Sequence, residues 1–373
     1  MAASSSTLHC GLRGRPDGLA PVNKQLFEFM DSTRRAQGDV FAALGLGPNE
    51  CAYHIIAQAP LWRLRAYSAR TAGPPLLIVA APIKKPYIWD IAPGASAVSY
   101  CLGHGVSTYL LEWLEPRDGH GDIGLDVYAD QGLSQAVQMV QRVSEGVKPF
   151  LIGHSLGGTL AAIYASLEPD DIQGLFVIGA PLCFQNGTSR FRDIVASVSS
   201  PDFSDSSIVP GSFLSQCSAM AAPGPFIWSR LLDAVLSVGD PVAMGIHGRV
   251  ERWALDEVPL PGKLLRETLQ RLYQQDRFYA GTLRVGKRMA GPSKITVPIL
   301  AVVNSADEIV PRGAVQPFLD AVASRDVQLL EYPGDIGVAL QHVGMLVGRT
   351  ARAQVWPKIV AWIKQRDEVP YSQ

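Results

Sequence analysis

The chain has 373 residues, of which 47% are hydrophobic and 18% are charged, and its formal net charge is −1. This composition is typical of a globular chain that is long enough for one large domain with an insertion, or for two domains. The near-neutral charge gives no electrostatic reason to expect a nucleic-acid partner, and no run approaches the roughly 18 apolar residues that a membrane span needs.

The N-terminal segment, residues 1–72, is predicted to be partly disordered and then helical. Residues 1–20 are polar, rich in Gly and Ser, and lack the apolar core of a secretory signal. The stretch "NKQLFEFMDSTRRAQGDVFAAL" (23–44) has a helical pattern, and "WRLRAYS" (62–68) fits a strand.

From residue 73 onward, short apolar strands alternate with amphipathic helices. Strands that are apolar throughout indicate a parallel sheet with helices on both faces. The predicted strands are 75–83, 109–114, 149–153, 174–182, the stretch "VPILAVVN" that starts at Val297, and 327–333. The predicted helices are 133–145, 158–167, 313–323 and 357–365. Residues 73–182 and 297–373 are therefore expected to form the core of an α/β-hydrolase fold, a doubly wound and mainly parallel sheet.

The alternation stops near Leu182, and residues 183–296 interrupt the core. The Ser- and Pro-rich stretch 199–213 is predicted to be a loop, whereas 262–279 has the pattern of an amphipathic helix. An insertion at this point of a doubly wound sheet lies over the carboxyl ends of the strands, where ligands bind. We expect a mainly helical cap.

The stretch "KPFLIGHSLGGTLAAIYASL" (148–167) carries Gly153, Ser155 and Gly157 in the G-x-S-x-G spacing. In a nucleophile elbow a strand ends at a strained turn and a helix begins, and a Cβ two residues from the serine would clash. The same spacing also arises where small residues merely suit a tight bend. The apolar strand before Ser155 and the helical pattern from Leu156 favour a nucleophile.

A serine nucleophile needs a base within hydrogen-bond reach and a carboxylate that orients the base. In this fold the chain order is Ser, then Asp or Glu, then His. Asp307 lies in the loop after the strand that starts at Val297, and His342 is expected in the loop after the following strand. These two are the predicted acid and base.

Other acids and histidines compete for these roles. Glu308 is the immediate neighbour of Asp307, and Asp335 is too close to His342 in sequence to be presented from another strand. His104, His120 and His247 follow no late strand and are weaker candidates for the base.

The oxyanion hole is expected to use two backbone N–H groups. The first is that of Leu156 at the start of the helix, where the helix dipole also helps. The second is expected from Ile83, in the loop after the first strong strand, since Pro82 has no N–H to donate.

The cysteines and histidines are scattered along the chain. Five cysteines without C-x-x-C spacing indicate reduced thiols and a cytoplasmic protein, not a disulfide framework. The dispersed histidines form no zinc pattern, so no metal and no cofactor is expected.

Taken together, these stretches resemble the polyhydroxyalkanoate synthases. The resemblance runs from about residue 73 to 365 and is most specific in "VERWALDEVPLPGKLLRETLQRLYQQDRFYAGTL", which is similar to the family's cap helix pattern. It also rests on the stretches 75–98, 107–116, 297–311 and 342–348. The resemblance implies an acyl-transfer enzyme whose short N-terminal region is similar to that of the compact synthases that work with a partner subunit.

The chain departs from the pattern that the resemblance implies. The family carries a cysteine nucleophile in a G-x-C-x-G-G box, where this sequence has Ser155, preceded by His154. Gln341 stands where the family usually has glycine beside its histidine. A serine ester is a poorer acyl donor to a hydroxyl than a cysteine thioester, so a synthase scaffold redirected to one acyl transfer per cycle is expected.

The leading hypothesis is a serine hydrolase acting on an acyl ester or thioester of the hydroxyacyl type, with CoA or a carrier protein as the donor of a thioester. An acyltransferase with an alcohol or amine acceptor, and a synthase with a serine nucleophile, are the alternatives. A non-catalytic binder of polymer granules or of a synthase subunit is the remaining reading. A homodimer formed through the cap is also compatible with the sequence.

Overall fold

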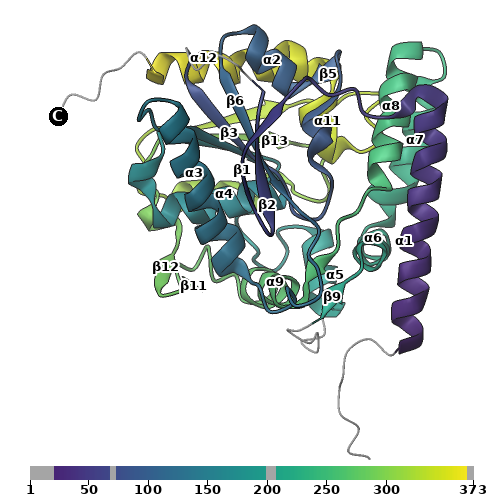
Figure 1. Cartoon of the computed structure of the whole chain (residues 1–373), viewed down its shortest axis with the longest axis horizontal. Helices are drawn as coiled ribbons and strands as arrows, with labels where there is room; N and C mark the ends of the chain where they lie inside the picture. The colour runs from purple at the N-terminus through teal and green to yellow at the C-terminus, as the bar shows by residue number, and fades with distance from the viewer. Residues whose placement is uncertain (1–20, 68–72, 199–206, 368–373) are drawn as a thin grey trace, which may run out of the picture.

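The computed structural model describes residues 21–67, 73–198 and 207–367; the predicted disordered residues 1–20 and part of the Ser/Pro-rich stretch (199–206) lie outside them. An eight-stranded sheet in the order β1-β2-β6-β3-β7-β8-β13-β14 crosses the molecule (Figure 1). Its strands are β1 (His54–Ala59), β2 (Trp62–Ala66), β3 (Pro75–Val79), β6 (Ser107–Trp113), β7 (Phe150–His154), β8 (Gly174–Ile178), β13 (Ile299–Asn304) and β14 (Val327–Tyr332). From β6 to β14 all pairs are parallel, while β1 and β2 are antiparallel, so the mainly parallel sheet is confirmed.

Successive side chains of the central strands enter two separate hydrophobic cores. Leu77 and Val79 of β3 pack with the helices α3 (Gly132–Val143), α4 (Leu156–Leu167) and α10 (Gln316–Ala321). Leu76 and Ile78 point to the opposite face, where α2 (Ala97–Gly103), α11 (Gln341–Val347) and α12 (Trp356–Asp367) cover the sheet. Both faces are therefore buried, which explains why these strands are apolar at every position.

Three strands of the sheet differ from the prediction. The strand β8 ends at Ile178 instead of residue 182, because the chain turns at Gly179, which has φ 48°. The strand β3 ends at Val79 instead of residue 83, because the chain from Ile83 to Lys85 turns aside and hydrogen-bonds to residues 256–258. The edge strand β1 was not predicted, since its residues are half-buried or exposed and carry no apolar alternation.

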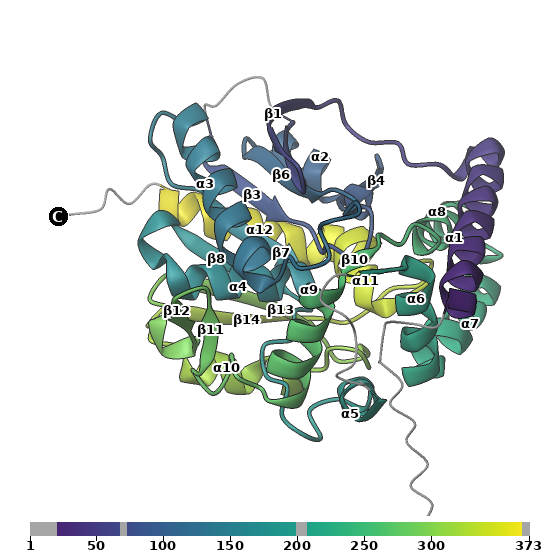
Figure 2. The same cartoon turned by 60° about the horizontal axis from the view of Figure 1, so that its bottom comes forward.

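The described residues of the insertion 183–296 lie between β8 and β13 and are mainly helical (Figure 2). They form α5 (Arg190–Val198), α6 (Gly211–Ala221), α7 (Ser229–Ser237), α8 (Pro241–Ala254) and α9 (Gly262–Glu267), together with the short strands β9 (Ile208–Val209), β10 (Leu260–Pro261), β11 (Leu283–Val285) and β12 (Arg288–Ala290). The amphipathic helix expected at 262–279 is present as α9 and a continuing helical segment that ends at Gln274.

The loop predicted for 199–213 is wrong where the structure describes it, because β9 lies within this range and α6 already begins at Gly211. The helix start is held from outside the insertion. The N–H of Ser212 donates to the Asp31 carboxylate at 2.8 Å, and the Ser212 hydroxyl donates to the carbonyl of Phe27 at 2.9 Å. These partners are about 180 residues away in sequence, and local composition does not reveal them.

The helix α1 (Pro21–Phe41) packs against α6 and α8 at the side of the molecule (Figure 1). The rings of Phe27 and Phe213 meet edge to face with centroids 5.4 Å apart. The N-terminal helix is thus joined to the inserted helices, and the predicted helix at 23–44 is confirmed in its main part.

Candidate active site

Ser155 lies at the sharp turn between β7 and α4. Its backbone has φ 54° and ψ −133°, a conformation that costs strain for any residue with a side chain. Neighbouring glycines make room for the turn: a Cβ on Gly157 would lie 2.3 Å from the Val79 carbonyl oxygen, and one on Gly158 would lie 2.5 Å from the Ala180 Cβ. The strand, strained turn and helix expected for a nucleophile elbow are all present.

Asp307 and His342 form a buried hydrogen-bonded pair, although 35 residues separate them. The His342 Nδ1–H donates to Asp307 Oδ2 at 2.6 Å, and the carboxylate also accepts the N–H groups of Ile309 and Val310 at 2.9 and 3.2 Å. Burial alone would raise the pKa of Asp307, but His342 and the two N–H groups lower it below its ordinary value. The carboxylate therefore stays ionised and fixes the proton of His342 on Nδ1.

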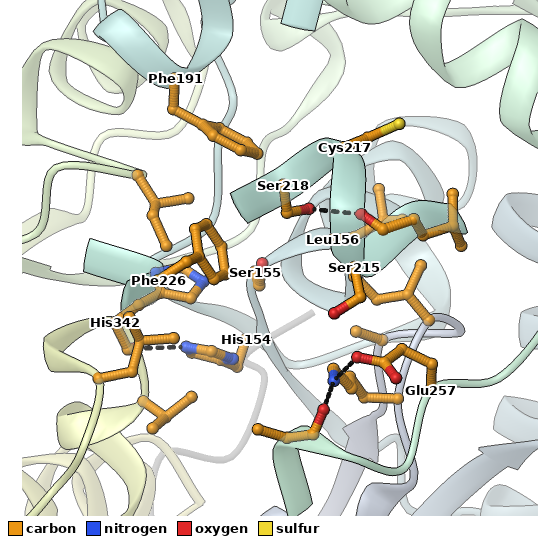
Figure 3. Close-up of a pocket in the computed structure, with 18 of the residues that line it drawn as sticks. His154, Ser155, Leu156, Phe191, Ser215, Cys217, Ser218, Phe226, Glu257 and His342 are labelled. Carbon is orange, nitrogen blue, oxygen red and sulfur yellow. Dashed lines mark hydrogen bonds and ion pairs between the residues drawn. The ribbon is translucent and has the colours of Figure 1, made fainter. Parts of the chain in front are cut away.

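His342 lies in the first turn of α11, not in a loop as the sequence predicted. The helix forms because Val343, Met345 and Leu346 are all buried. Gly344 is needed within it, because a Cβ there would lie only 2.8 Å from the Tyr332 hydroxyl. The His342 Nε2 is buried and has no hydrogen-bond partner among the described residues. His342 and Ser155 line the same cavity (Figure 3).

The competing acids are occupied elsewhere or do not hold the base. Asp335 accepts the Tyr332 hydroxyl at 2.8 Å and the N–H and hydroxyl of Thr350 at 2.8 and 2.9 Å, so its carboxylate closes a turn. The amide of Gln341 bonds the backbone of the same turn at Asp335. Asp307, and not Glu308, accepts from His342.

His154 precedes Ser155 in the chain and holds the backbone of His342 by a hydrogen bond. Its Nε2–H donates to the backbone carbonyl of His342 at 2.8 Å, and the two ring centroids are 4.5 Å apart. Burial, and then the proximity of His342, lower the pKa of His154 to about 3, so its imidazole is neutral. The sequence marked His154 only as a departure from a family pattern and gave no sign of this contact.

The two expected oxyanion donors border the cavity. Leu156 is the first residue of α4, where an N–H has no partner within the helix. Ile83 follows β3, and its carbonyl accepts the N–H of Val258 at 3.1 Å. The loop that carries Ile83 is therefore attached to the inserted segment through the backbone.

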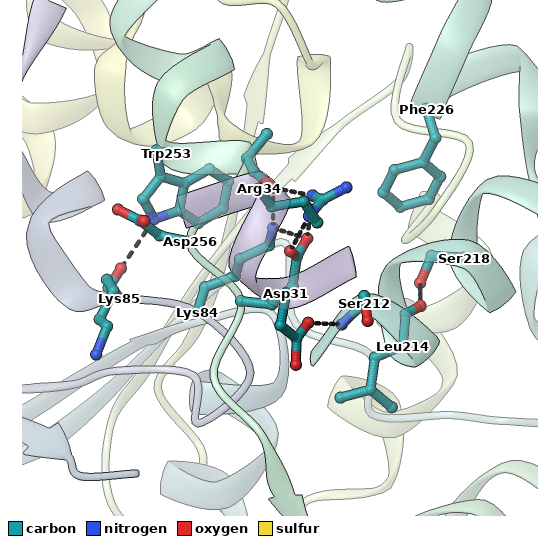
Figure 4. A network of polar contacts seen from close by, with 12 residues as sticks. Asp31, Arg34, Lys84, Lys85, Ser212, Leu214, Ser218, Phe226, Trp253 and Asp256 are labelled. Atoms are coloured by element: carbon teal, nitrogen blue, oxygen red, sulfur yellow. Dashed lines mark hydrogen bonds and ion pairs between the residues drawn. The ribbon is translucent and has the colours of Figure 1, made fainter. Parts of the chain in front are cut away.

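Charged side chains reinforce this attachment (Figure 4). Lys84 Nζ donates to Glu257 at 2.5 Å and to the carbonyl of Ala254 at 2.6 Å. Arg34 of α1 reaches the same Glu257 with two hydrogen bonds of 2.8 Å. Lys84 and Arg34 share one carboxylate, so α1, the insertion and the loop after β3 meet at Glu257, an arrangement that sequence reasoning missed because the three segments are far apart in the chain.

The cavity beside Ser155 measures about 730 Å³. Its charged lining residues are paired within the protein, Lys84 with Glu257, Lys85 with Glu115 and Arg230 with Glu251. Apolar side chains dominate the rest of the wall, including Phe191, Ile194, Phe213, Leu214, Phe226 and Leu269. The space accordingly suits an uncharged, apolar group.

The described residues show neither a metal centre nor a membrane-spanning helix. No group of three or more His, Cys, Asp or Glu side chains among them is arranged to hold a metal ion. Within the described ranges, no helix combines the length and the apolar character needed to cross a bilayer.

Comparisons with known proteins agree with this architecture. The sequence family described as "Serine aminopeptidase, S33" matches residues 102–222. The chain is 28% identical to the poly(3-hydroxyalkanoate) polymerase subunit PhaC of Haloferax mediterranei, over 94% of this chain and 72% of that protein. It is 26% identical to the PhaC subunit of Allochromatium vinosum, over 94% and 98%. A soluble variant of monoglyceride lipase from Saccharomyces cerevisiae matches in structure with a TM-score of 0.55 at 11% identity, over 86% and 97%.

These findings confirm the α/β-hydrolase fold and the resemblance to polyhydroxyalkanoate polymerases over most of the chain. They support an enzyme of the α/β-hydrolase class.

Proposed function

We propose that the chain is a serine acyl-transfer enzyme in which Ser155 is the nucleophile, His342 the general base and acid, and Asp307 the residue that orients His342. The backbone N–H groups of Leu156 and Ile83 are proposed to form the oxyanion hole. The observation that carries the proposal is the buried His342, held by Asp307 at 2.6 Å on Nδ1, with an unpartnered Nε2 in a cavity that Ser155 shares.

The proposed first half-reaction forms an acyl-enzyme. Ser155 Oγ bonds to the acyl carbon while its proton passes to His342 Nε2, and negative charge develops on the carbonyl oxygen. The bond to the alcohol or thiol then breaks, and His342 returns the proton to that leaving group. Asp307 stabilises the imidazolium that exists between the two proton transfers, and the N–H donors stabilise the oxyanion.

In the proposed second half-reaction an acceptor attacks the acyl-serine by the reverse sequence of proton transfers. Hydrolysis is the leading form of the proposal, because water is always present as an acceptor. Transfer to an alcohol or amine is the second form, and the two differ in how well the insertion, residues 183–296, excludes water as a cap. We treat this insertion as a cap domain between core segments 73–182 and 297–373.

The relatives are named polyhydroxyalkanoate polymerases, which supports an acyl group of the hydroxyacyl type. The apolar wall of the cavity suits the carbon chain of such a group. Thr268 also lines the cavity, and its hydroxyl has no partner among the described residues, which supports a polar group on the acyl chain. Polymerisation with a serine nucleophile is a weaker alternative, because a serine ester donates poorly to the next hydroxyl. A non-catalytic binder of granules or of a partner subunit has the least support, because it leaves the Asp307–His342 pair without a role.

The proposed donor is an ester or a thioester of CoA or of a carrier protein. A cytoplasmic location is proposed from the cysteines, since Cys51, Cys101, Cys183 and Cys217 are all free thiols.

Incubation with an activated hydroxyacyl ester, followed by intact-protein mass spectrometry, tests the proposal. We expect a transient mass gain of one acyl group that maps to Ser155 and disappears as free acid forms. Ser155→Ala, which suits the turn sterically, should gain no mass and lose about 10⁴-fold or more in kcat. A growing ladder of masses would favour polymerisation, and substantial turnover by Ser155→Ala would refute the proposal.

Ser155→Cys separates hydrolase from synthase more sharply. Acylation without any oligomer would locate the single-transfer behaviour in the cap and cavity, which is the result we expect because His154 and Gln341 also depart from the synthase pattern. Oligomer formation from a hydroxyacyl-CoA would instead assign it to the nucleophile alone.

A further inference from the structure

A second buried histidine–carboxylate pair lies outside the proposed catalytic groups. It joins Asp233 of α7 to His247 of α8, whose side chains are 9% and 8% exposed. His247 Nδ1–H donates to Asp233 Oδ2 at 2.7 Å. Neither residue lines the cavity beside Ser155, so the pair does not act on substrate.

The remaining bonds of Asp233 point to the segment that leads into α11. Asp233 Oδ1 accepts the N–H of Gly337 at 2.8 Å, and Oδ2 accepts the N–H of Ala339 at 2.8 Å. Burial alone would raise the pKa of Asp233, but His247 and these two N–H groups lower it below its ordinary value. An ionised carboxylate thus links two inserted helices to the chain just before His342.

The backbone of this segment is held in a conformation that it does not favour by itself. Ala339 has φ 57°, which is rare for a residue with a side chain and persists only where the surroundings enforce it. Gly337 has φ 82° and is pressed against α8, because a Cβ there would lie 2.6 Å from the Cβ of Ala243. Asp233 supplies the hydrogen bonds that hold both residues in place.

The segment 337–339 leads directly into the turn that carries the proposed base, His342. The N–H of Leu340 donates to the carbonyl of Val338 at 2.6 Å, and the N–H of Val343 donates to the carbonyl of Leu340 at 3.0 Å, which starts the turn that carries His342. Asp307 fixes the ring of His342 and His154 fixes its carbonyl, but neither bonds the backbone that precedes it. Figure 1 shows α7 and α8 beside the end of the sheet where α11 begins.

We infer that Asp233, oriented by His247, is a positioning residue that holds the segment 337–339 so that His342 Nε2 faces Ser155. The inference rests on the proposed function, because it assigns His342 as the base. If Asp233 holds this segment, the position of His342 depends on the positions of α7 and α8. The inserted helices then affect the catalytic step.

The kinetic test uses Asp233→Asn in the full chain, with a chromogenic acyl ester as substrate. We expect kcat to fall about 10- to 100-fold, as a displacement of about 1 Å in a catalytic group does. KM should change less than kcat, since Ala339 is the only residue of the segment 337–339 that lines the cavity. Covalent labelling of Ser155 by a fluorophosphonate should slow in parallel with kcat.

Three further variants distinguish the positioning of His342 from a general loss of packing. His247→Asn keeps a donor near the position of Nδ1 and should retain more of kcat than His247→Leu. Asp240→Asn is the matched control, because Asp240 caps the start of α8 with bonds to the N–H groups of Val242 and Ala243 and does not reach residues 337–339. Equal losses in Asp240→Asn and Asp233→Asn would overturn the inference.

A readout that does not depend on turnover keeps the two proposals apart. The Nδ1 proton of His342, in its 2.6 Å hydrogen bond to Asp307, should give a strongly deshielded NMR resonance. Asp233→Asn should shift or broaden this resonance in a folded protein, and an unchanged resonance would overturn the inference whatever the Ser155→Ala result. Turnover by Ser155→Ala with a shifted resonance would instead refute the proposed function and leave the positioning of His342 supported.

Discussion

The rings of His154 and His342 lie side by side, but their surroundings differ and suit them to different roles. His342 has a buried carboxylate on Nδ1 and an Nε2 without a hydrogen-bond partner among the described residues, which suits the uptake and return of a proton. His154 has only a backbone carbonyl as its partner, and burial keeps it neutral, which suits a fixed support. The residue type is the same, and the difference lies in the charge that faces each ring.

We predict that Asp307→Asn lowers kcat by about 10⁴-fold, because the amide favours the wrong tautomer of His342. Asp335→Asn should leave kcat nearly unchanged and lower the free energy of unfolding, since that carboxylate only closes the turn to Thr350. Steady-state kinetics and urea denaturation of both variants provide the check. Comparable losses of kcat in the two would contradict the assignment of Asp307.

His154 should make the stability of the protein sensitive to acid. Its pKa is about 3 in the folded chain, against an ordinary value of 6.5 that the unfolded chain retains, so between these values the unfolded state binds more protons. The free energy of unfolding must therefore fall as the pH falls through this window, by about 2 kcal/mol from this group between pH 7 and pH 5.

The comparison variant is His154→Gln, whose amide nitrogen can replace the donor to the His342 carbonyl but does not titrate. Urea denaturation at pH 7 and pH 5 should show a smaller loss of stability in the variant than in the natural chain. Identical losses would mean that His154 is not held neutral.

Among the elements, the loop after β3 depends on the inserted segment for its shape. Backbone bonds run from the N–H of Val258 to the carbonyl of Ile83 at 3.1 Å and from the N–H of Lys85 to the carbonyl of Asp256 at 3.3 Å. The Trp253 indole N–H adds a bond to the carbonyl of Lys85 at 2.8 Å. A proposed oxyanion donor is thus carried on a loop that the core alone does not hold.

The ion pair at this junction gives a prediction at the scale of elements. The Lys84 and Glu257 side chains are 19% and 5% exposed, and Glu257→Gln leaves the charges of Lys84 and Arg34, which share this carboxylate, without their partner. We expect a loss of about 3 kcal/mol or more in the free energy of unfolding, because a charge left alone in a buried site is costly. Adding Lys84→Met should recover part of this loss, and strictly additive effects in chemical denaturation would contradict a direct interaction.

For the whole molecule, the outer face of α7 is the most unusual surface. Trp228, Leu232 and Val235 are 67%, 59% and 69% exposed, and their neighbours Arg230 and Asp233 are paired inside the protein. An exposed apolar face of this kind is typical of an interface. On this basis we propose that α7 contributes to a homodimer through the cap, which the sequence also allowed.

The corresponding prediction is that Leu232→Glu with Val235→Glu converts a dimer into a monomer in light-scattering measurements at micromolar concentration. The added charges cannot be buried against a second copy. Val147→Glu is the matched control, since Val147 is 43% exposed on the core and should leave the mass unchanged. A monomeric natural chain at the same concentration would refute the dimer.

The sequence by itself determined the parallel core and the location of the serine turn, because both depend on local patterns. Apolar strands mark a sheet buried on both faces, and Gly153, Gly157 and Gly158 surround a turn that admits no Cβ at these positions. The order of Ser155, Asp307 and His342 follows from the winding of the chain, so their proximity could be expected before the structure.

Only the tertiary structure decided which distant groups contact the site and the loop after β3. His154 contacts a carbonyl 188 residues away, Asp233 bonds an N–H 104 residues away, and Arg34 meets Glu257 across 223 residues. Such contacts leave no periodic or local pattern in the sequence, since each depends on how the inserted helices and α1 pack against the core. The loop predicted before α6 was wrong for the same reason, because Ser212 is held by a helix from the other end of the chain.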